Sequence, residues 1–318
     1  MKGRSDGGPM NFTGLITQSL RDRKSKVETG QFSTPPRPGS SFREFINSLP
    51  DLLAAREFRE VVSCIVAAAR NDKMILVGMG AHPIKVGLGP TIIALMERGV
   101  VKGLAMNGAG VIHDVEIAMA GKTSEEVGEL LETGLFGSAR EPAEFINAAV
   151  QQGYSKGWGM GMAVGKAMRE ARLPHEGMSV CAATFRLNLP LTVHVAIGTD
   201  VVHMHPSTDG AALGELTYRD FRIFASLVAS LDGGAYINIG SAVIMPEVFL
   251  KALSAARNLG HIVDDFLTVN MDCIQHYRPL QNVVRRPTAK SGKGIALTGH
   301  HEIMLPLLAA AVVEELDS

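Results

Sequence analysis

Hydrophobic residues along this chain follow two alternating patterns. Helical periodicity is strong over residues 55–70, where apolar side chains form one stripe made of Phe58, Val61, Val62, Ile65 and Val66. Two short apolar runs follow, at residues 74–77 and 100–106, and after each run a glycine-rich turn leads into another helical pattern. Runs of this length, bounded by turn residues, predict buried strands.

The alternation of strand and helix patterns continues to the C-terminus. Helical patterns extend to about residue 171, and further strands are predicted at residues 191–197, 235–239, 262–269 and 294–297. Helices predicted at residues 213–231, 246–258 and 302–316 separate several of these strands. Because strand–helix–strand units connect by right-handed crossovers, this order predicts an α/β fold with a mostly parallel sheet and helices on both faces.

The first 41 residues differ from the rest of the chain. They contain a basic run at residues 21–26 and a turn-rich stretch at residues 33–41 that suits a linker. We therefore expect a poorly ordered segment over residues 1–41, followed by a single α/β domain over residues 42–318. Residues 15–20 could form an amphipathic turn that docks on a neighbouring protein, and a floppy tail is the alternative.

Composition and charge exclude several classes of protein. The chain has 318 residues, 31 of them basic and 32 acidic, so no overall charge directs it to nucleic acid or to an anionic membrane. Its three cysteines (Cys64, Cys181 and Cys273) are far apart, which favours a reducing compartment over a disulfide framework. The start lacks the apolar core of a signal peptide, and no apolar run reaches the roughly 18 residues of a membrane helix. We expect a soluble, cytoplasmic protein.

Histidines lie at several predicted strand ends and helix starts. They are His82, His113, His203, His205, His300 and His301. Residues 200–215 carry two of them, together with Asp209, directly after a predicted buried strand. Because α/β folds bind ligands at the carboxyl ends of their parallel strands, the sequence predicts a small-molecule site at this edge of the sheet.

His203 and His205 also suggest a metal site. Two residues apart on an extended segment, their rings lie on one face and could supply two ligands, with Asp209, Asp114 or His300 as the third. The alternative is a set of hydrogen-bonding residues in a pocket that holds no metal. The sequence contains no CxxC or HExxH pattern to support a metal, and no GxSxG motif for a serine nucleophile.

Two glycine-rich turns could bind an anion. Residues 78–80 and 107–110 each follow a predicted strand and open toward a helix, so backbone N–H groups and the positive helix end could face a phosphate. Neither turn is a complete GxGxxG motif, and tight turns between a strand and a helix also use glycine for purely steric reasons. The motif alone leaves both interpretations open.

Taken in order, these motifs resemble the deoxyhypusine synthase family. Gly80-Ala81-His82 and Asn107-Gly108-Ala109 fall where that family contacts NAD, and residues 208–215 are similar to its Thr-Asp-Gly-Ser-Leu-Gly-Asp motif. Residues 299–308 resemble the family's last cofactor-contacting motif. The similarity runs from about residue 73 to the C-terminus and is faint between about residues 121 and 190.

The resemblance implies a Rossmann-like sheet, NAD as cofactor and a homotetramer, in a family of NAD-dependent aminobutyl transferases. Carried over residue by residue, it implies cofactor contacts at Gly80, Ala81, His82, Asn107, Gly108, Ala109, Asp209, His300 and His301.

Departures from the family pattern concern its chemistry. The family's Trp-Gly-Lys, whose lysine forms an imine intermediate, has no counterpart in the matching residues 284–288. Lys290 and Lys293 lie in a Gly/Ser-rich loop, whereas an imine-forming lysine must be desolvated. Ile112-His113 replaces the acidic pair that receives the polyamine, and His300 replaces an aspartate. We therefore expect that the original reaction is lost.

Three hypotheses about function follow. The first is a divergent protein that binds NAD or a related nucleotide and acts on an unidentified small molecule, with His113 or His205 as acid or base. The second is a metal-dependent hydrolase or lyase that uses His203, His205 and Asp209. The third is an oligomeric ligand-binding protein without turnover. Separately, we expect a dimer or tetramer, to which the apolar helix of residues 303–313 offers a face to bury.

Overall fold

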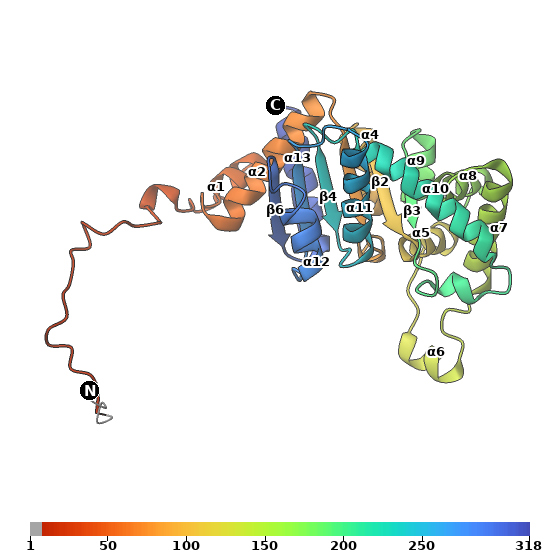
Figure 1. Ribbon diagram of the computed structural model, residues 1–318, viewed down its shortest axis with the longest axis horizontal. Helices are drawn as coiled ribbons and strands as arrows, with labels where there is room; N and C mark the ends of the chain where they lie inside the picture. Colours follow the sequence, from red (N-terminus) through yellow and green to blue (C-terminus); the bar gives the residue numbers. More distant parts are fainter. Residues whose placement is uncertain (1–7) are drawn as a thin grey trace.

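The computed structural model describes residues 8–318, and in that range it contains one six-stranded sheet (Figure 1). The strands are β1 (Ile75–Met79), β2 (Gly103–Asn107), β3 (Leu191–His194), β4 (Ala235–Ile239), β5 (Leu267–Asp272) and β6 (Lys293–Thr298). All are parallel and stand in the order β3-β2-β1-β4-β5-β6. The strand order reverses between β1 and β4, as it does in doubly wound dinucleotide-binding folds. The predicted α/β, Rossmann-like fold is confirmed.

Helices surround the sheet. They are α1 (Phe42–Ser48), α2 (Leu53–Arg70), α3 (His82–Lys85), α4 (Gly89–Glu97), α5 (Gly108–Ala120), α6 (Val127–Thr133), α7 (Arg140–Lys156), α8 (Met160–Ala171), α9 (Val180–Arg186), α10 (Gly210–Val228), α11 (Ile244–Asn258), α12 (Tyr277–Pro279) and α13 (His301–Leu316). Short 3-10 turns lie at Thr29–Gln31, Glu176–Met178 and Val201–Met204, and a π-helical turn lies at Leu280–Arg285.

Two apolar cores hold these layers together. On one face of the sheet, Tyr236 of β4 stacks on Phe249 of α11, with ring centroids 3.8 Å apart, and Phe224 of α10 packs beside them. On the other face, α2, α4 and α13 bury side chains such as Ile65 and Leu308 against the strands. Because the central strands are covered on both faces, they appear in the sequence as continuous apolar runs.

Several predicted boundaries shift by a few residues. The strand predicted at 262–269 begins only at Leu267, because the backbone N–H groups of Asp264 and Asp265 donate to the Asp232 carboxylate and form a turn instead. The strand predicted at 191–197 ends at His194. The helix predicted from residue 213 begins at Gly210, because Asp209 accepts hydrogen bonds from the N–H groups of Ala211 and Ala212 as its N-cap.

The apolar side of α13 is used inside the chain. Its buried residues include Leu305, Leu308 and Val312, and the helix packs on α2, so this side does not provide the free face expected for oligomerisation. Of its large apolar residues, Ile303 is exposed. Within residues 8–318 no helix is both long and apolar enough to cross a membrane.

Candidate functional site

The carboxyl ends of β1 and β4 meet at the point where the strand order reverses. Here the backbone segments that leave the two strands touch, because the Gly80 N–H donates to the Ile239 carbonyl at 3.0 Å. A Cβ added to Gly80 would lie 2.2 Å from the Gly240 carbonyl oxygen. Glycine at position 80 is therefore required by the packing of these two segments, whether or not a nucleotide approaches.

Two histidines form a pair at this edge. His82 begins α3 directly after β1, His301 begins α13 after β6, and their Nδ1 atoms lie 2.9 Å apart. The His301 Nε2 atom lies 3.1 Å from the Met271 carbonyl oxygen, which can only accept a hydrogen bond. A neutral His301 therefore carries its proton on Nε2 and accepts at Nδ1 from the Nδ1–H of His82. This assignment leaves the Nε2 atom of His82 unprotonated.

The electrostatics of the pair favour a neutral His82. Burial lowers the pKa of His82, and the His301 ring lowers it further. His301 itself is 2% exposed, and its Nε2 lies 3.8 Å from the Asp272 carboxylate. His301 thus acts as an internal support, while the exposed His82 ring can meet a ligand. Of the cofactor contacts expected from the family resemblance, these two are brought together. The adjacent His300 is largely exposed, with Nδ1 4.0 Å from the Glu302 carboxylate.

The turn after β2 already holds a carboxyl group of this chain. Asn107 caps α5 by accepting a hydrogen bond from the Gly110 N–H at 3.0 Å. The carboxyl group of Asp200, from the segment after β3, lies against the same turn, and a Cβ added to Gly108 would be 2.1 Å from its Oδ2 atom. Burial raises the pKa of Asp200, while His203, Thr199 and the Ala109 N–H act in the opposite direction. The positive end of α5 therefore faces a carboxyl group of this chain.

His203 points inward and supports Asp200. Its Nδ1 accepts hydrogen bonds from the N–H groups of Gly198 and Asp200, at 3.1 Å and 3.3 Å. Nε2 then carries the proton and faces Asp200 Oδ2 at 3.7 Å. This buried arrangement positions the loop that carries Asp200.

His205 and Asp209 have separate local roles. The His205 Nδ1 lies 2.7 Å from the Ser207 hydroxyl, and Asp209 caps α10 while also accepting a hydrogen bond from the Gln151 side chain. Hydrogen bonds from the Gln151 side chain and from the backbone N–H groups of Ala212 and Ala211 lower the pKa of Asp209. Among residues 8–318, no group of three or more histidine, cysteine, aspartate or glutamate side chains could hold a metal ion. His203, His205 and Asp209 are therefore not brought together as a metal site.

A cavity of ≈ 160 Å³ lies among α3, α5, the start of α6 and the segment after β3, which are elements that follow the carboxyl ends of β1, β2 and β3. We call it the His113 pocket. Residues that bear on its chemistry are Lys85, Ala109, Ile112, His113, Glu116 and Asp200. His113 and Ala109 were expected at the site from the sequence, whereas Lys85, Glu116 and Asp200 were not.

His113 belongs to a hydrogen-bonded group in this pocket. Its Nδ1 lies 2.6 Å from the Thr123 hydroxyl and 3.2 Å from the Glu116 carboxylate, and Thr123 also bonds to Glu116. Burial raises the pKa of Glu116, but the hydrogen bonds from His113 and Thr123 outweigh it and the net shift is downward. An ionised Glu116 places the proton of neutral His113 on Nδ1 and leaves Nε2 free to accept one. This is the geometry of an oriented acid–base histidine.

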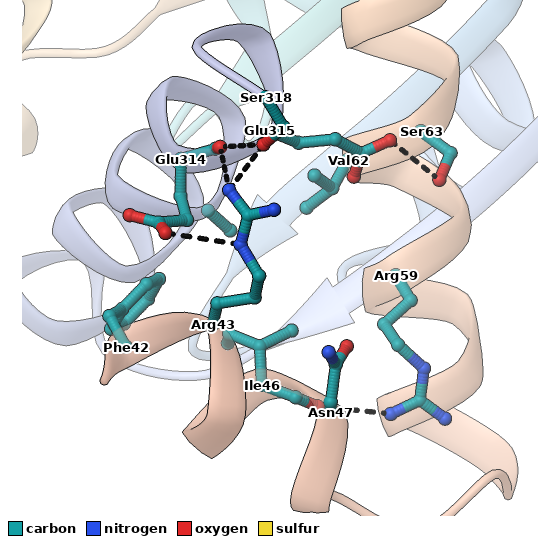
Figure 2. A pocket seen from close by; sticks show the side chains of 11 residues that line it. Phe42, Arg43, Ile46, Asn47, Arg59, Val62, Ser63, Glu314, Glu315 and Ser318 are labelled. Carbon is teal, nitrogen blue, oxygen red and sulfur yellow. Dashed lines mark hydrogen bonds and ion pairs between the residues drawn. The ribbon is translucent and has the colours of Figure 1, made fainter. Parts of the chain in front are cut away.

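Another cavity lies outside the sheet, among α1, α2 and α13. It has a volume of ≈ 340 Å³, and Figure 2 shows that its polar side chains already pair with one another. The Arg43 Nε atom lies 3.2 Å from the Glu314 carboxylate, and the Ser63 hydroxyl lies 3.4 Å from the Glu315 carboxylate. Both glutamates belong to the last turns of α13, away from the strand ends. We therefore place the candidate site at the carboxyl edge of the sheet.

The two lysines considered for imine formation lie at the other edge. Lys293 is the first residue of β6 and pairs with Glu60 of α2. Lys290 pairs with Asp264, which precedes β5, at 3.1 Å. Since β5 and β6 are parallel, both lysines are at the amino ends of the strands, opposite the histidine pair and the His113 pocket.

The chain was compared with protein-family models, curated proteins and solved structures, and only solved structures match it. No protein-family model and no curated protein matches the chain. Among solved structures, a protein assigned as LOR/SDH from Methanococcus maripaludis S2 has a TM-score of 0.53 at 16% identity, covering 95% of this chain and 76% of that one. A protein assigned as deoxyhypusine synthase from Entamoeba histolytica has a TM-score of 0.50 at 13% identity, covering 87% of this chain and 94% of that one.

A further similar structure contains a cofactor. The ternary complex of AgrE with ornithine and NAD+ has a TM-score of 0.53 at 14% identity and covers 82% of this chain. The chain spans about a third of the length of AgrE, 34% in that structure. At such identities the likeness establishes the fold alone. The chain thus has an α/β fold like that of deoxyhypusine synthase-like and LOR/SDH proteins, a fold in which at least one protein binds NAD+.

Proposed function

We propose that this protein binds NAD or a related nucleotide at the carboxyl edge of its sheet and acts on a small molecule in the His113 pocket. The hydrogen-bonded group of His113, Glu116 and Thr123 carries the proposal, because it presents an oriented base inside a cavity at the strand ends. The reversal of strand order between β1 and β4 supports the nucleotide, since doubly wound folds bind nucleotides there. The NAD+ complex of AgrE supports it by analogy of fold.

The residues fit a nucleotide at one of the two glycine turns. At Gly108 the buried Asp200 carboxyl occupies the space that a pyrophosphate would need, so this turn does not fit. At the β1 turn the atom beside Gly80 is the backbone carbonyl oxygen of Gly240 and not a carboxyl group. The Nε2 atom of His82 and the exposed His300 are the groups there that can meet a ligand. We assign the nucleotide to this β1 turn. A bound NAD would supply hydride transfer.

His113 would handle the proton of the reaction. Its Nε2 atom accepts a proton from the substrate, while Nδ1–H remains bonded to Thr123 and Glu116. The carboxylate of Glu116 stabilises the imidazolium that results. Lys85 and Asp200 line the same pocket and place an amine and a carboxyl group beside the substrate. At about 30 Å³ per water molecule, ≈ 160 Å³ suits a small substrate.

Calorimetric titration with NAD and NADH tests the cofactor assignment. We expect binding to the wild-type protein and a loss of at least about tenfold in affinity for His82→Ala, which corresponds to about 1.4 kcal/mol. His261→Ala is the matched control, because His261 is exposed and lies before β5, at the other end of the strands. No heat at millimolar nucleotide would contradict the nucleotide assignment.

The role of His113 is tested separately. His113→Ala is expected to retain nucleotide binding and to lose turnover of any substrate found in a metabolite thermal-shift screen, by about 100-fold or more. Full turnover in this variant would remove the base from the proposal while leaving nucleotide binding untouched.

A further inference from the structure

The N-terminal arm, residues 8–28, extends away from the body of the protein (Figure 1). Its hydrogen bonds are local, such as those from the Leu15 N–H to the Phe12 carbonyl and from the Asp22 N–H to the Ser19 carbonyl. Large apolar side chains of the arm are nevertheless exposed, with Leu15 at 67%, Ile16 at 96% and Leu20 at 69%. Apolar side chains gathered on an exposed segment indicate a surface that another protein covers.

The arm also carries unpaired positive charge. Arg21, Arg23, Lys24 and Lys26 follow the apolar residues, with Asp22 as the one acidic residue among them. In the described part of the chain, none of these four basic side chains forms an ion pair within 4.0 Å. A surface that is both apolar and acidic would complement the arm.

Helix α6 has the complementary properties. It contains no buried residue, and Val127, Leu131 and nearby Leu135 are among the exposed large apolar side chains. Glu126, Glu129 and Glu132 are exposed, and across residues 8–318 they too form no ion pair. A helix of seven residues is marginal in water unless another surface packs on it. An uncovered helix with exposed leucines is thus a candidate docking surface.

We propose that the arm of one copy of this chain binds α6 of a second copy. Leu15, Ile16 and Leu20 would cover the apolar residues of α6, and the basic run would face its glutamates. In Figure 1 the arm leaves the end of the molecule that holds α1 and β6, whereas α6 projects near the opposite end, beside α5. If two copies exchange their arms, the arm of each copy covers α6 of the other, and the result is a closed two-fold dimer. Val127 also lines the His113 pocket, so this interface adjoins the proposed substrate site, whereas the nucleotide is assigned to the β1 turn.

Two charge-reversal variants test the interface by analytical ultracentrifugation. The first carries Arg21→Glu, Arg23→Glu and Lys24→Glu, and the second carries Glu126→Lys, Glu129→Lys and Glu132→Lys. In the first variant both surfaces are negative, and in the second both are positive. We expect each variant alone to dimerise at least about tenfold more weakly than the wild type, since three pairs of opposite charge become repulsive.

Mixing the two variants gives the decisive result. In the mixture each negative surface meets a positive one, so we expect a heterodimer that neither variant forms alone. Reversal of exposed charges elsewhere, Glu57→Lys with Glu144→Lys, is the matched control and should leave the wild-type association unchanged. Circular dichroism melting curves establish that the variants fold.

Three results would overturn the proposal. They are a wild-type protein that stays monomeric at high micromolar concentration, association that persists undiminished in both variants, and a mixture that behaves as the two variants do separately. Each of these leaves the nucleotide titrations unaffected, so failure of the interface and failure of the proposed function are distinguishable.

Discussion

The Nδ1 atoms of His82 and His301 lie 2.9 Å apart, although 219 positions separate the two residues in the sequence. Only one of the two nitrogen atoms can carry the shared proton, and the contact of His301 with the Met271 carbonyl assigns that proton to His82. The pair therefore loses its hydrogen bond if both rings become charged. This coupling has a direct experimental consequence.

We predict that His301→Ala raises the pKa of His82. Burial is the main cause that lowers this pKa, and the neighbouring His301 ring is the next. Removing the His301 ring removes its effect on the pKa of His82. It also opens the space beside His82 to water, which weakens the effect of burial. Titration of the His82 ring protons by NMR measures the change, and His300→Ala is the control because its ring is exposed and is not among the groups that shift the pKa of His82 most. An unchanged pKa in His301→Ala would contradict the pairing.

The orientation of His113 gives a second prediction, which does not require a known substrate. In the wild type, ¹⁵N NMR should show His113 as the Nδ1–H tautomer, because Thr123 and Glu116 both lie at Nδ1. Replacing both partners, as Glu116→Ala with Thr123→Val, should shift the population toward the Nε2–H tautomer. An Nε2–H tautomer in the wild type would show that Nδ1 is the accepting atom and would remove the proposed base.

Gly108 and Asp200 form a pair suited to a double-mutant cycle. Gly108→Ala should destabilise the fold by about 1–3 kcal/mol, because its Cβ would lie 2.1 Å from the Asp200 Oδ2 atom. In an Asp200→Ala background the same substitution should cost less than about 1 kcal/mol, since the obstructing carboxyl is gone. Urea unfolding measures the four free energies. Equal costs in both backgrounds would mean that the carboxyl of Asp200 does not lie against this turn.

Whether a feature of the fold or the site could be predicted from the sequence depends on how far apart in the sequence the interacting residues lie. Strands such as β1 and β2 were predictable because each is a short, mostly apolar run that the fold buries. The contact between Asp200 and Gly108 depends on the pairing of β2 with β3, which no local pattern specifies. The same limit applies to the pairing of His82 with His301.

Two roles could have been found from local spacing. Glu116 stands three residues after His113, and residues at that separation on a helix are neighbours. Asp209 precedes Gly210 and two alanines at the start of a helical pattern, which is the signature of an N-cap. The resemblance to a cofactor-binding motif implies that Asp209 contacts a ligand, whereas in the structure its carboxylate caps α10.

The buried Asp220 should make stability depend on pH. Its carboxylate accepts hydrogen bonds from the N–H groups of Gly161 and Val193, at 2.8 Å each, but burial dominates and raises its pKa to about 7. The unfolded chain ionises near its ordinary value of 3.8, so the folded state binds the extra proton between the two values. Stability from this group is therefore complete below about pH 4 and is lost as pH rises to about 7, on the order of 4 kcal/mol.

Asp220→Asn should remove this dependence. We expect the difference in unfolding free energy between variant and wild type to shift in favour of the variant as pH rises from about 4 to 7. Urea midpoints at several pH values measure it. Asp232→Asn is an opposite-sign control, since hydrogen bonds from Asp265 and Asp264 lower the pKa of Asp232. A pH-independent difference for Asp220→Asn would refute a raised pKa.

The last prediction concerns aminobutyl transfer, which would require a lysine to form an imine with a spermidine-derived intermediate. Lys290 and Lys293 are paired with carboxylates at the amino edge of the sheet, away from the candidate site. Lys85 does line the His113 pocket, but it is exposed, whereas an imine-forming lysine must be desolvated. We therefore expect incubation with spermidine and NAD, followed by borohydride, to leave the protein mass unchanged. Peptide mass spectrometry would locate any adduct, and an adduct on Lys85, Lys290 or Lys293 would restore a polyamine transferase.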